Sequence, residues 1–177
     1  AEPMSPIEVS ELYSNFASGG FNLKPKAVIG VLDSAGAPLS HHSIVLKQTI
    51  NPVISNTLNR SLELTMRRGT GRFSSFSKSG VAGKTGTTND NRDSWFAGFD
   101  DNNLAVFWVG RDDNKSTGLS GASGALKLWD ASLRRIGSSP LSIPTDETFV
   151  NIEYSTGKMA RPTCADTVEI PVTCLLY

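Results

Sequence analysis

Two apolar segments separated by a short polar turn constrain the fold of this chain more than any other feature. Residues 94–99 and 104–110 are apolar at nearly every position rather than at alternate ones, and Asp and Asn residues fill positions 100–103 between them. A turn this short joins antiparallel strands, and strands that are apolar on both sides are covered on both faces. We therefore expect an α/β protein of the α+β type, with an antiparallel sheet sandwiched between helices.

Three helices are predicted to supply the covering layers. Ser5 is a candidate N-cap, with Pro6 at the first helical position and Glu8 placed to complete a capping box. Asn51 and Pro52 begin a second helix, and its apolar stripe continues to residue 66. A third helix has apolar residues at helical spacing, namely Leu126, Trp129, Leu133 and Ile136.

The remaining segments divide the chain into a body and an appendage. Residues 28–32 predict a short strand, and residues 37–39 a second extended piece after a turn. His41 and His42 follow in a polar loop that supports neither metal binding nor catalysis. We assign residues 1–137 to the body and residues 138–177 to a small appendage with a weak hairpin around residues 150–157.

Composition excludes several kinds of partner and ligand. Seventeen basic residues balance seventeen acidic ones without any block of like charge, so we expect no contact with nucleic acid or with a membrane surface. No apolar run reaches the length of a membrane span. Zinc takes four ligands, and the two cysteines lie far in sequence from the two histidines, which are adjacent to each other, so we expect neither a metal nor another cofactor.

The stretch Gly-Lys-Thr-Gly-Thr-Thr at residues 83–88 carries the chemistry. It supplies a cation, three hydroxyls and two flexible backbone positions, a combination that suits an anionic ligand lying against a strand edge. An exposed edge strand that carries a lysine against aggregation is the simpler alternative. A phosphate-binding P-loop is excluded, because it requires a glycine where Lys78 stands and a helix directly after the Lys-Thr pair.

The stretch resembles the Lys-Thr-Gly motif of penicillin-binding transpeptidases and serine β-lactamases. Its extension through the segment from Asp93 to residue 99 is similar to class A, bifunctional penicillin-binding proteins. The resemblance runs from about residue 3 to residue 129, in the family's order. Further segments that carry it are residues 5–8, 16–20, 68–72, 109–112 and 121–125.

The resemblance implies a peptidoglycan D,D-transpeptidase that cross-links stem peptides through an acyl-serine and binds penicillin. Lys84 would take part in proton transfer and charge balance, and the backbone N–H of Thr87 would be one of two oxyanion donors. The hydroxyls of Thr85 and Thr87 would hold the carboxylate of a D-Ala-D-Ala donor or β-lactam. Gly86 would permit that approach, and Thr88 would complete the substrate-binding set. Three residues would support the site without taking part in the chemistry, namely Arg72, Asp93 and Trp95.

Acyl transfer on this scaffold also requires a Ser-x-x-Lys nucleophile and a Ser-x-Asn element. The chain has no Ser-x-Asn triplet, and we reject Ser75 and Ser155 as nucleophiles although each has a lysine three residues later, because both lie in loop or turn contexts. The resemblance therefore implies the C-terminal half of a transpeptidase domain. Its expected partners are the missing N-terminal half, stem peptides and β-lactams. The family further implies an upstream glycosyltransferase domain and an anchor outside this chain, which hold the protein on the periplasmic side of the inner membrane.

Two other classes of function remain open alongside this one. A non-catalytic penicillin-recognition or sensor module, or a β-lactamase-like hydrolase fragment, would keep the same strand. A pure interaction fragment would use the C-terminal tail. An exported protein would also favour a short-loop disulfide between Cys164 and Cys174, and a pair of half-buried thiols is the alternative.

Overall fold

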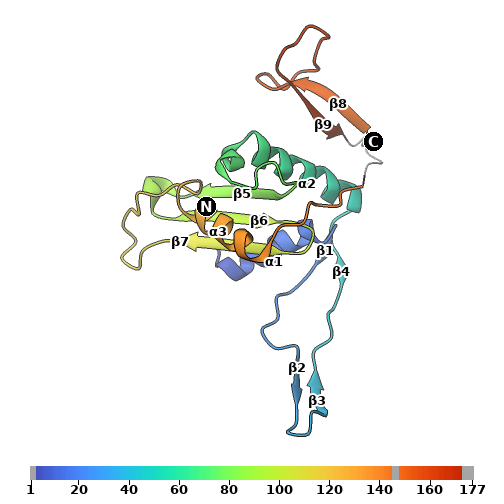
Figure 1. The fold of residues 1–177 in the computed structure, drawn as a ribbon, viewed down its shortest axis with the longest axis vertical. Helices are drawn as coiled ribbons and strands as arrows, with labels where there is room; N and C mark the ends of the chain where they lie inside the picture. The colour runs from blue at the N-terminus through green and yellow to red at the C-terminus, as the bar shows by residue number, and fades with distance from the viewer. Residues whose placement is uncertain (1–2, 145–147, 173–177) are drawn as a thin grey trace.

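A three-stranded antiparallel sheet lies at the centre of the fold. The computed structural model describes residues 3–144 and 148–172 of the chain. Strands β5 (Ala82–Thr87), β6 (Ser94–Phe99) and β7 (Leu104–Val109) pair in that order, each antiparallel to the next (Figure 1). The two apolar segments therefore form the predicted hairpin, and the second strand ends one residue earlier than expected.

The turn between β6 and β7 is built around Asp100, whose side chain is 3% exposed. Its Oδ1 accepts hydrogen bonds from the backbone N–H groups of Asn102 (2.9 Å) and Asn103 (2.7 Å). Its Oδ2 accepts one from the backbone N–H of Ser139, 3.0 Å away. One carboxylate thus closes the hairpin and also holds the chain that follows the last helix of the body.

Helix α3 (Ala125–Ile136) covers one face of the sheet. The Trp129 ring lies 5.0 Å from that of Phe96, and both side chains are fully buried together with Leu126 and Leu133. The predicted stripe is therefore the core, except that Ile136 is exposed. Burying an aromatic side chain stabilises a fold by about 2–3 kcal/mol, so the burial of Trp129 helps to hold α3 on the sheet.

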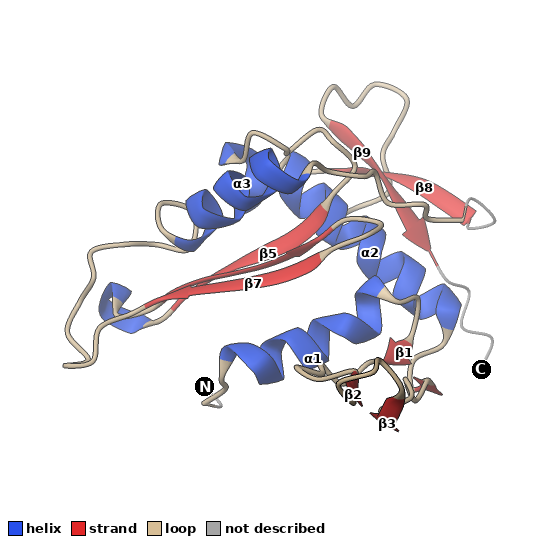
Figure 2. Cartoon of the chain, turned by 60° about the horizontal axis from the view of Figure 1, so that its bottom comes forward, coloured by secondary structure: helices blue, strands red, loops and turns tan. Residues whose placement is uncertain are grey.

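Helices α1 (Pro6–Ala17) and α2 (Pro52–Arg67) complete the layers. Both begin as predicted, α1 with the Ser5–Glu8 capping box and α2 with the Asn51 side chain accepting a hydrogen bond from a backbone N–H. Helix α1 lies across the sheet from α3, and α2 packs along β5 (Figure 2). The sheet is thus covered on both faces, which confirms the predicted sandwich.

Residues 21–50 form an arm that projects from the body (Figure 1). Strands β1 (Phe21–Asn22) and β4 (Lys47–Gln48) pair at its base, and β2 (Gly30–Leu32) pairs with β3 (Pro38–His41) near its tip. Both short strands near the tip were expected from the sequence. The projection of the arm was not expected. It leaves aliphatic side chains such as Ile29 and Ile44 about three-quarters exposed (74% and 75%), whereas side chains of this kind are usually buried.

The C-terminal segment forms a second hairpin, β8 (Thr148–Glu153) with β9 (Thr167–Val172). The sequence predicts a turn at residues 156–157, and the chain does turn there. The main partner of β8 is nevertheless β9, which pairs with it along its length. The segment directly after the turn meets β8 in a single bridge, between Ile152 and Met159. Arg68 of the C-cap of α2 joins this hairpin to the body by an ion pair with Asp166 at 3.0 Å. The division at residue 137 remains our proposal.

Two further expectations concern the cysteines and the membrane. Cys164 lies half-buried in the loop between β8 and β9, and Cys174 lies outside the described residues, so the disulfide remains a prediction. Among the helices in the described ranges, none has both the length and the apolar character that a membrane span requires.

Candidate active site

The motif residues occupy β5, at an edge of the sheet. Within residues 3–144 and 148–172, this strand pairs only with β6. The backbone N–H of Thr88 donates to the carbonyl oxygen of Asp93 at 3.1 Å, and hydrogen-bonded pairs alternate along an antiparallel ladder. The N–H and C=O groups of Thr87 and Thr85 therefore point away from β6, towards the open edge.

The motif hydroxyls lie on the face that α3 covers. In the register of the sheet, Thr85 is opposite Phe96 and Thr87 is opposite Ser94. Directly opposed residues share a face, and Phe96 packs on α3. The two threonines thus point to the same side, as strand alternation predicts.

Lys84 and Gly86 lie on the other face, opposite Ala97 and Trp95. The exposed side chain of Lys84 turns back to the strand edge, where its Nζ donates to the carbonyl oxygen of Thr85 at 2.8 Å. Among the described residues its ammonium makes no ion pair. A cation without an ion-pair partner in the described structure therefore stands beside the outward-facing backbone of the motif.

The Thr85 hydroxyl is already engaged by the short helix η1 (Thr70–Phe73), which precedes the strand. The Oγ1 atoms of Thr85 and Thr70 are 2.6 Å apart, and Thr85 is only 9% exposed. Nothing in the sequence indicated this partner, because the two residues belong to different elements.

The Thr87 hydroxyl meets the turn that precedes α3. The backbone N–H of Gly121 donates to Thr87 Oγ1 at 2.9 Å. A Cβ atom at Gly121 would stand 2.6 Å from the carbonyl oxygen of Gly86 and 2.7 Å from that of Trp95, so only glycine fits here without movement. The turn before α3 is thus pressed against the backbone of the motif.

Asp93 and Trp95 lie at the end of the strand pair. The Asp93 carboxylate accepts hydrogen bonds from Thr88 Oγ1 (2.8 Å) and from Nε1 of Trp108 (3.0 Å), and the rings of Trp95 and Trp108 are 6.2 Å apart. These four residues line an open groove of about 550 Å³. Its other wall is the start of the chain and of α1, with Pro3, Met4, Pro6 and Val9.

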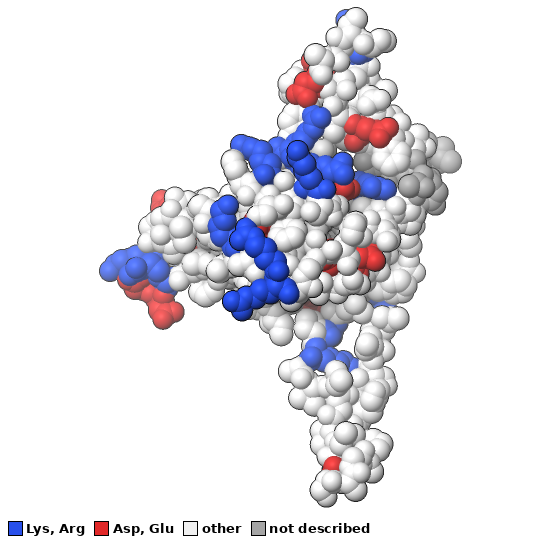
Figure 3. All heavy atoms as spheres, in the orientation of Figure 1, with Lys and Arg blue, Asp and Glu red and all other residues white. Residues whose placement is uncertain are grey.

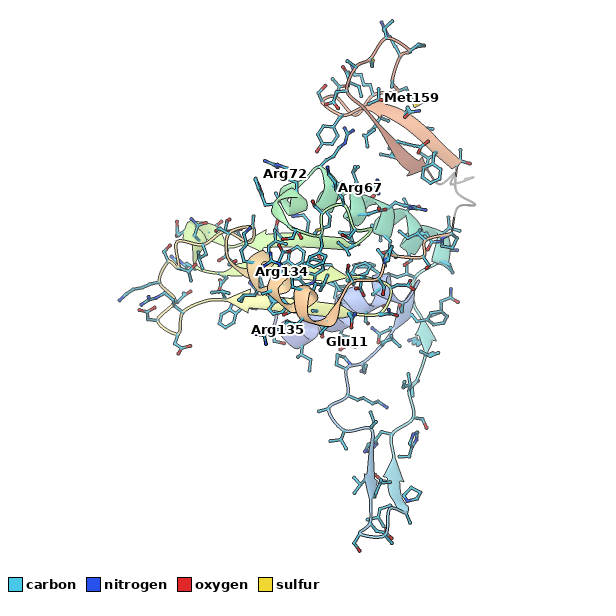
Figure 4. The ribbon with its side chains drawn as sticks, in the orientation of Figure 1. Glu11, Arg67, Arg72, Arg134, Arg135 and Met159 are labelled. Atoms are coloured by element: carbon cyan, nitrogen blue, oxygen red, sulfur yellow. The ribbon has the colours of Figure 1, made fainter. Side chains whose placement is uncertain are left out.

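Arg72 is held within its own turn. Its Nη1 donates to the carbonyl oxygen of Gly69 at 3.1 Å, and its guanidinium stacks 4.3 Å from the ring centroid of Phe73. Figure 4 shows it with Arg67 at the end of α2, on the face where Figure 3 shows several basic side chains together. Among the described residues, no hydrogen bond or ion pair joins the Arg72 side chain to the motif.

The two rejected serines lie outside helices, as expected. Ser75 is in the turns that follow η1, where its hydroxyl accepts a hydrogen bond from Arg134 at 2.7 Å, and Ser155 is in the turn after β8. The partner that sequence reasoning missed is Asp130 of α3, which is 1% exposed. Its carboxylate accepts hydrogen bonds from the Ser74 hydroxyl (2.5 Å) and from the Ser75 backbone N–H (2.9 Å). An acid next to the apolar stripe of α3 was the available signal.

An antiparallel sheet between helices, with Lys-Thr-Gly on its open edge strand, is the architecture of the penicillin-recognising serine transferases and hydrolases. Residues 3–127 match one family of this class, described as the penicillin binding protein transpeptidase domain. The chain belongs to this family, as part of the transpeptidase domain of class A members.

Sequence relatives and a solved structure agree with this family assignment. Penicillin-binding protein 1B of Vibrio cholerae is 34% identical over 154 residues, which cover 86% of this chain and 20% of that protein. The 1B protein of Haemophilus influenzae is 36% identical over 153 residues, which cover 84% and 20%. The chain thus spans about a fifth of these relatives. The crystal structure of penicillin-binding protein 1A from H. influenzae matches 94% of this chain and 32% of its own, with a TM-score of 0.75 and 23% identity, and confirms the fold class.

Proposed function

We propose that this chain supplies the Lys-Thr-Gly strand of a peptidoglycan D,D-transpeptidase, and that a segment outside it supplies the nucleophilic serine. The observation that carries the proposal is the open edge of β5, where the backbone of Thr87 and Thr85 faces outward beside the Lys84 ammonium. An edge that presents N–H groups and a cation suits an acyl donor with a carbonyl and a carboxylate.

In this reaction the serine oxygen attacks the carbonyl of the penultimate D-alanine, and the terminal D-alanine leaves with a proton. An amine of a second stem peptide then displaces the serine. The Thr87 N–H would stabilise the oxyanion, which is typically worth about 3–4 kcal/mol for one donor. Lys84 would assist proton transfer, and Thr85 and Thr87, with Thr88 next to them, would receive the carboxylate.

The site's surroundings support these roles without contributing chemistry. Asp93 fixes Thr88 and Trp108, and Trp95 forms part of the groove next to them. Arg72 would support the site indirectly, by stabilising the turn that precedes β5. We also propose, by analogy with the relatives, that the protein acts on the periplasmic side of the inner membrane.

Intact mass measurement with a β-lactam tests the proposal. This chain alone is expected to give no covalent adduct, because Ser75 is engaged by Asp130 and Arg134, and Ser155 lies in an exposed turn. The chain combined with the segment that carries Ser-x-x-Lys and Ser-x-Asn is expected to give one adduct per molecule. An adduct on the isolated chain, or none on the combination, contradicts the proposal.

A further inference from the structure

Each motif hydroxyl that would receive the carboxylate has a hydrogen-bond partner on another element. For Thr87 that partner is the backbone N–H of Gly121, 2.9 Å away. An amide N–H can only donate, so Thr87 Oγ1 accepts this bond and keeps its own proton for another acceptor. The side chain of Thr87 is exposed, so its hydroxyl can donate a hydrogen bond to an arriving ligand.

For Thr85 the partner is the hydroxyl of Thr70, at 2.6 Å. One hydrogen bond joins the two hydroxyls, so one of them donates and the other accepts. If Thr85 donates to Thr70, Thr85 has no proton left for an anion. If Thr70 donates, Thr85 is in the same state as Thr87.

We infer that Thr70 and Gly121 are positioning residues that donate hydrogen bonds to Thr85 and Thr87, so that both motif hydroxyls direct their own protons to a ligand carboxylate. The inference rests on the proposed function, since it concerns the same acyl donor. Hydrogen bonds to an ionised acceptor are roughly twice as strong as neutral ones, so an arriving carboxylate favours the arrangement in which Thr70 donates. Helix η1 and the turn before α3 thereby orient the hydroxyl protons of Thr85 and Thr87, although neither element pairs with β5.

Close packing explains why this role falls on a glycine in the turn before α3. A Cβ atom at Gly121 would lie 2.9 Å from the backbone nitrogen of Gly86 as well as 2.6 Å from its oxygen. Contacts this short force a displacement of the turn, and the N–H would move with it. Glycine therefore permits the approach that brings the donor to Thr87.

The test compares benzylpenicillin with its methyl ester, which keeps the β-lactam but lacks the carboxylate. In the full-length protein, Thr70→Val removes the hydroxyl and keeps the side-chain shape. We expect its acylation rate constant, kinact/KI, to fall roughly tenfold with benzylpenicillin and to stay near wild type with the ester. Thr70→Ser should restore the rate. Thr57→Val is the matched control, because the Thr57 hydroxyl donates within α2 itself, to the carbonyl oxygen of Val53.

Gly121→Ala should likewise lower kinact/KI more for benzylpenicillin than for its methyl ester. An equal fall with both compounds, or no fall with either, overturns the inference and leaves Thr70 and Gly121 as packing residues. A wild-type protein that neither compound acylates overturns the proposed function itself, and the inference with it. The two failures are therefore distinguishable.

Discussion

Ser94 Oγ accepts a hydrogen bond from the backbone N–H of Ala125 at 2.9 Å and donates one to the carbonyl oxygen of Ser120 at 2.8 Å. Ser94 and Ala125 are both fully buried. One hydroxyl of β6 therefore caps the first turn of α3 from outside the helix, where Gly124 at the N-cap position has no side chain to do so.

Replacing Ser94 by alanine should leave the N–H of Ala125 buried without a partner. We expect a loss of about 1–3 kcal/mol in the free energy of unfolding, which is the usual cost of such a group. Urea denaturation gives the measurement. Ser132→Ala is the control, since the Ser132 hydroxyl bonds to Leu128 within α3, and its effect should be small. Equal stability of the two variants would refute the capping role.

Asp130→Asn should destabilise the loop that leads into β5. The carboxylate accepts hydrogen bonds from Ser74 and Ser75, and an amide NH₂ in its place would set a donor against a donor. We expect about 1–3 kcal/mol of lost stability, measured by the denaturation midpoint. Asp112→Asn, at an exposed position, should change little. A neutral outcome at Asp130 would show that the loop does not depend on this anchor.

Lys84→Ala should slow acylation of the full-length protein while the fold stays intact. The side chain is exposed, so its removal leaves no cavity, but a proton-transferring group typically contributes about a hundredfold or more. Acylation kinetics with a fluorescent penicillin provide the measurement. Lys24→Ala, an exposed lysine of the arm, serves as control. Unchanged kinetics would return Lys84 to the role of an edge-strand charge against aggregation.

The capping box of α1 predicts a pH effect. The pKa of Glu8 is lowered from its ordinary value of 4.5, first by the backbone N–H of Ser5 and then by its hydroxyl. Because the folded pKa is the lower one, this stabilisation is present above pH 4.5 and is lost as the pH falls through the folded pKa. NMR titration should show the Glu8 pKa rising partway in Ser5→Ala. It should not change in Ser10→Ala, whose hydroxyl bonds to Ile7 instead.

The disulfide prediction is tested by mass. Cys164 and Cys174 should form one bond in protein from an oxidising compartment, closing a short loop worth about 2–3 kcal/mol in the chain-entropy model. Alkylation before and after reduction counts the thiols. Two reactive thiols before reduction would rule the bond out.

Local patterns in the sequence were sufficient for most of the body. The caps at Ser5 and Asn51 and the apolar runs of β6 and β7 each depend on neighbours within a few residues, and the helices and strands that they predict are present. The sandwich follows from them, because strands that are apolar on both sides require two covering layers.

Features that depend on long-range contacts were not predictable in the same way. The Thr70–Thr85 pair, the Gly121 donor and the buried Asp130 each join elements whose mutual position only the folded chain defines. The projection of the arm was missed for a different reason. The short run at residues 28–32 predicts a strand correctly, but such a run does not indicate whether its apolar side chains find a partner.

The order of the strands in the sheet has a consequence for how the chain folds. Because β5, β6 and β7 are consecutive in sequence and neighbours in space, their pairings close only short loops, and the Asp100 turn organises the central hairpin locally. Contacts of low sequence separation form fast. Helix α1 packs on β7 across most of the body's length, so its docking must close a long loop. We therefore expect the strand that carries Lys84 to form early and helix α1 to dock on the sheet later.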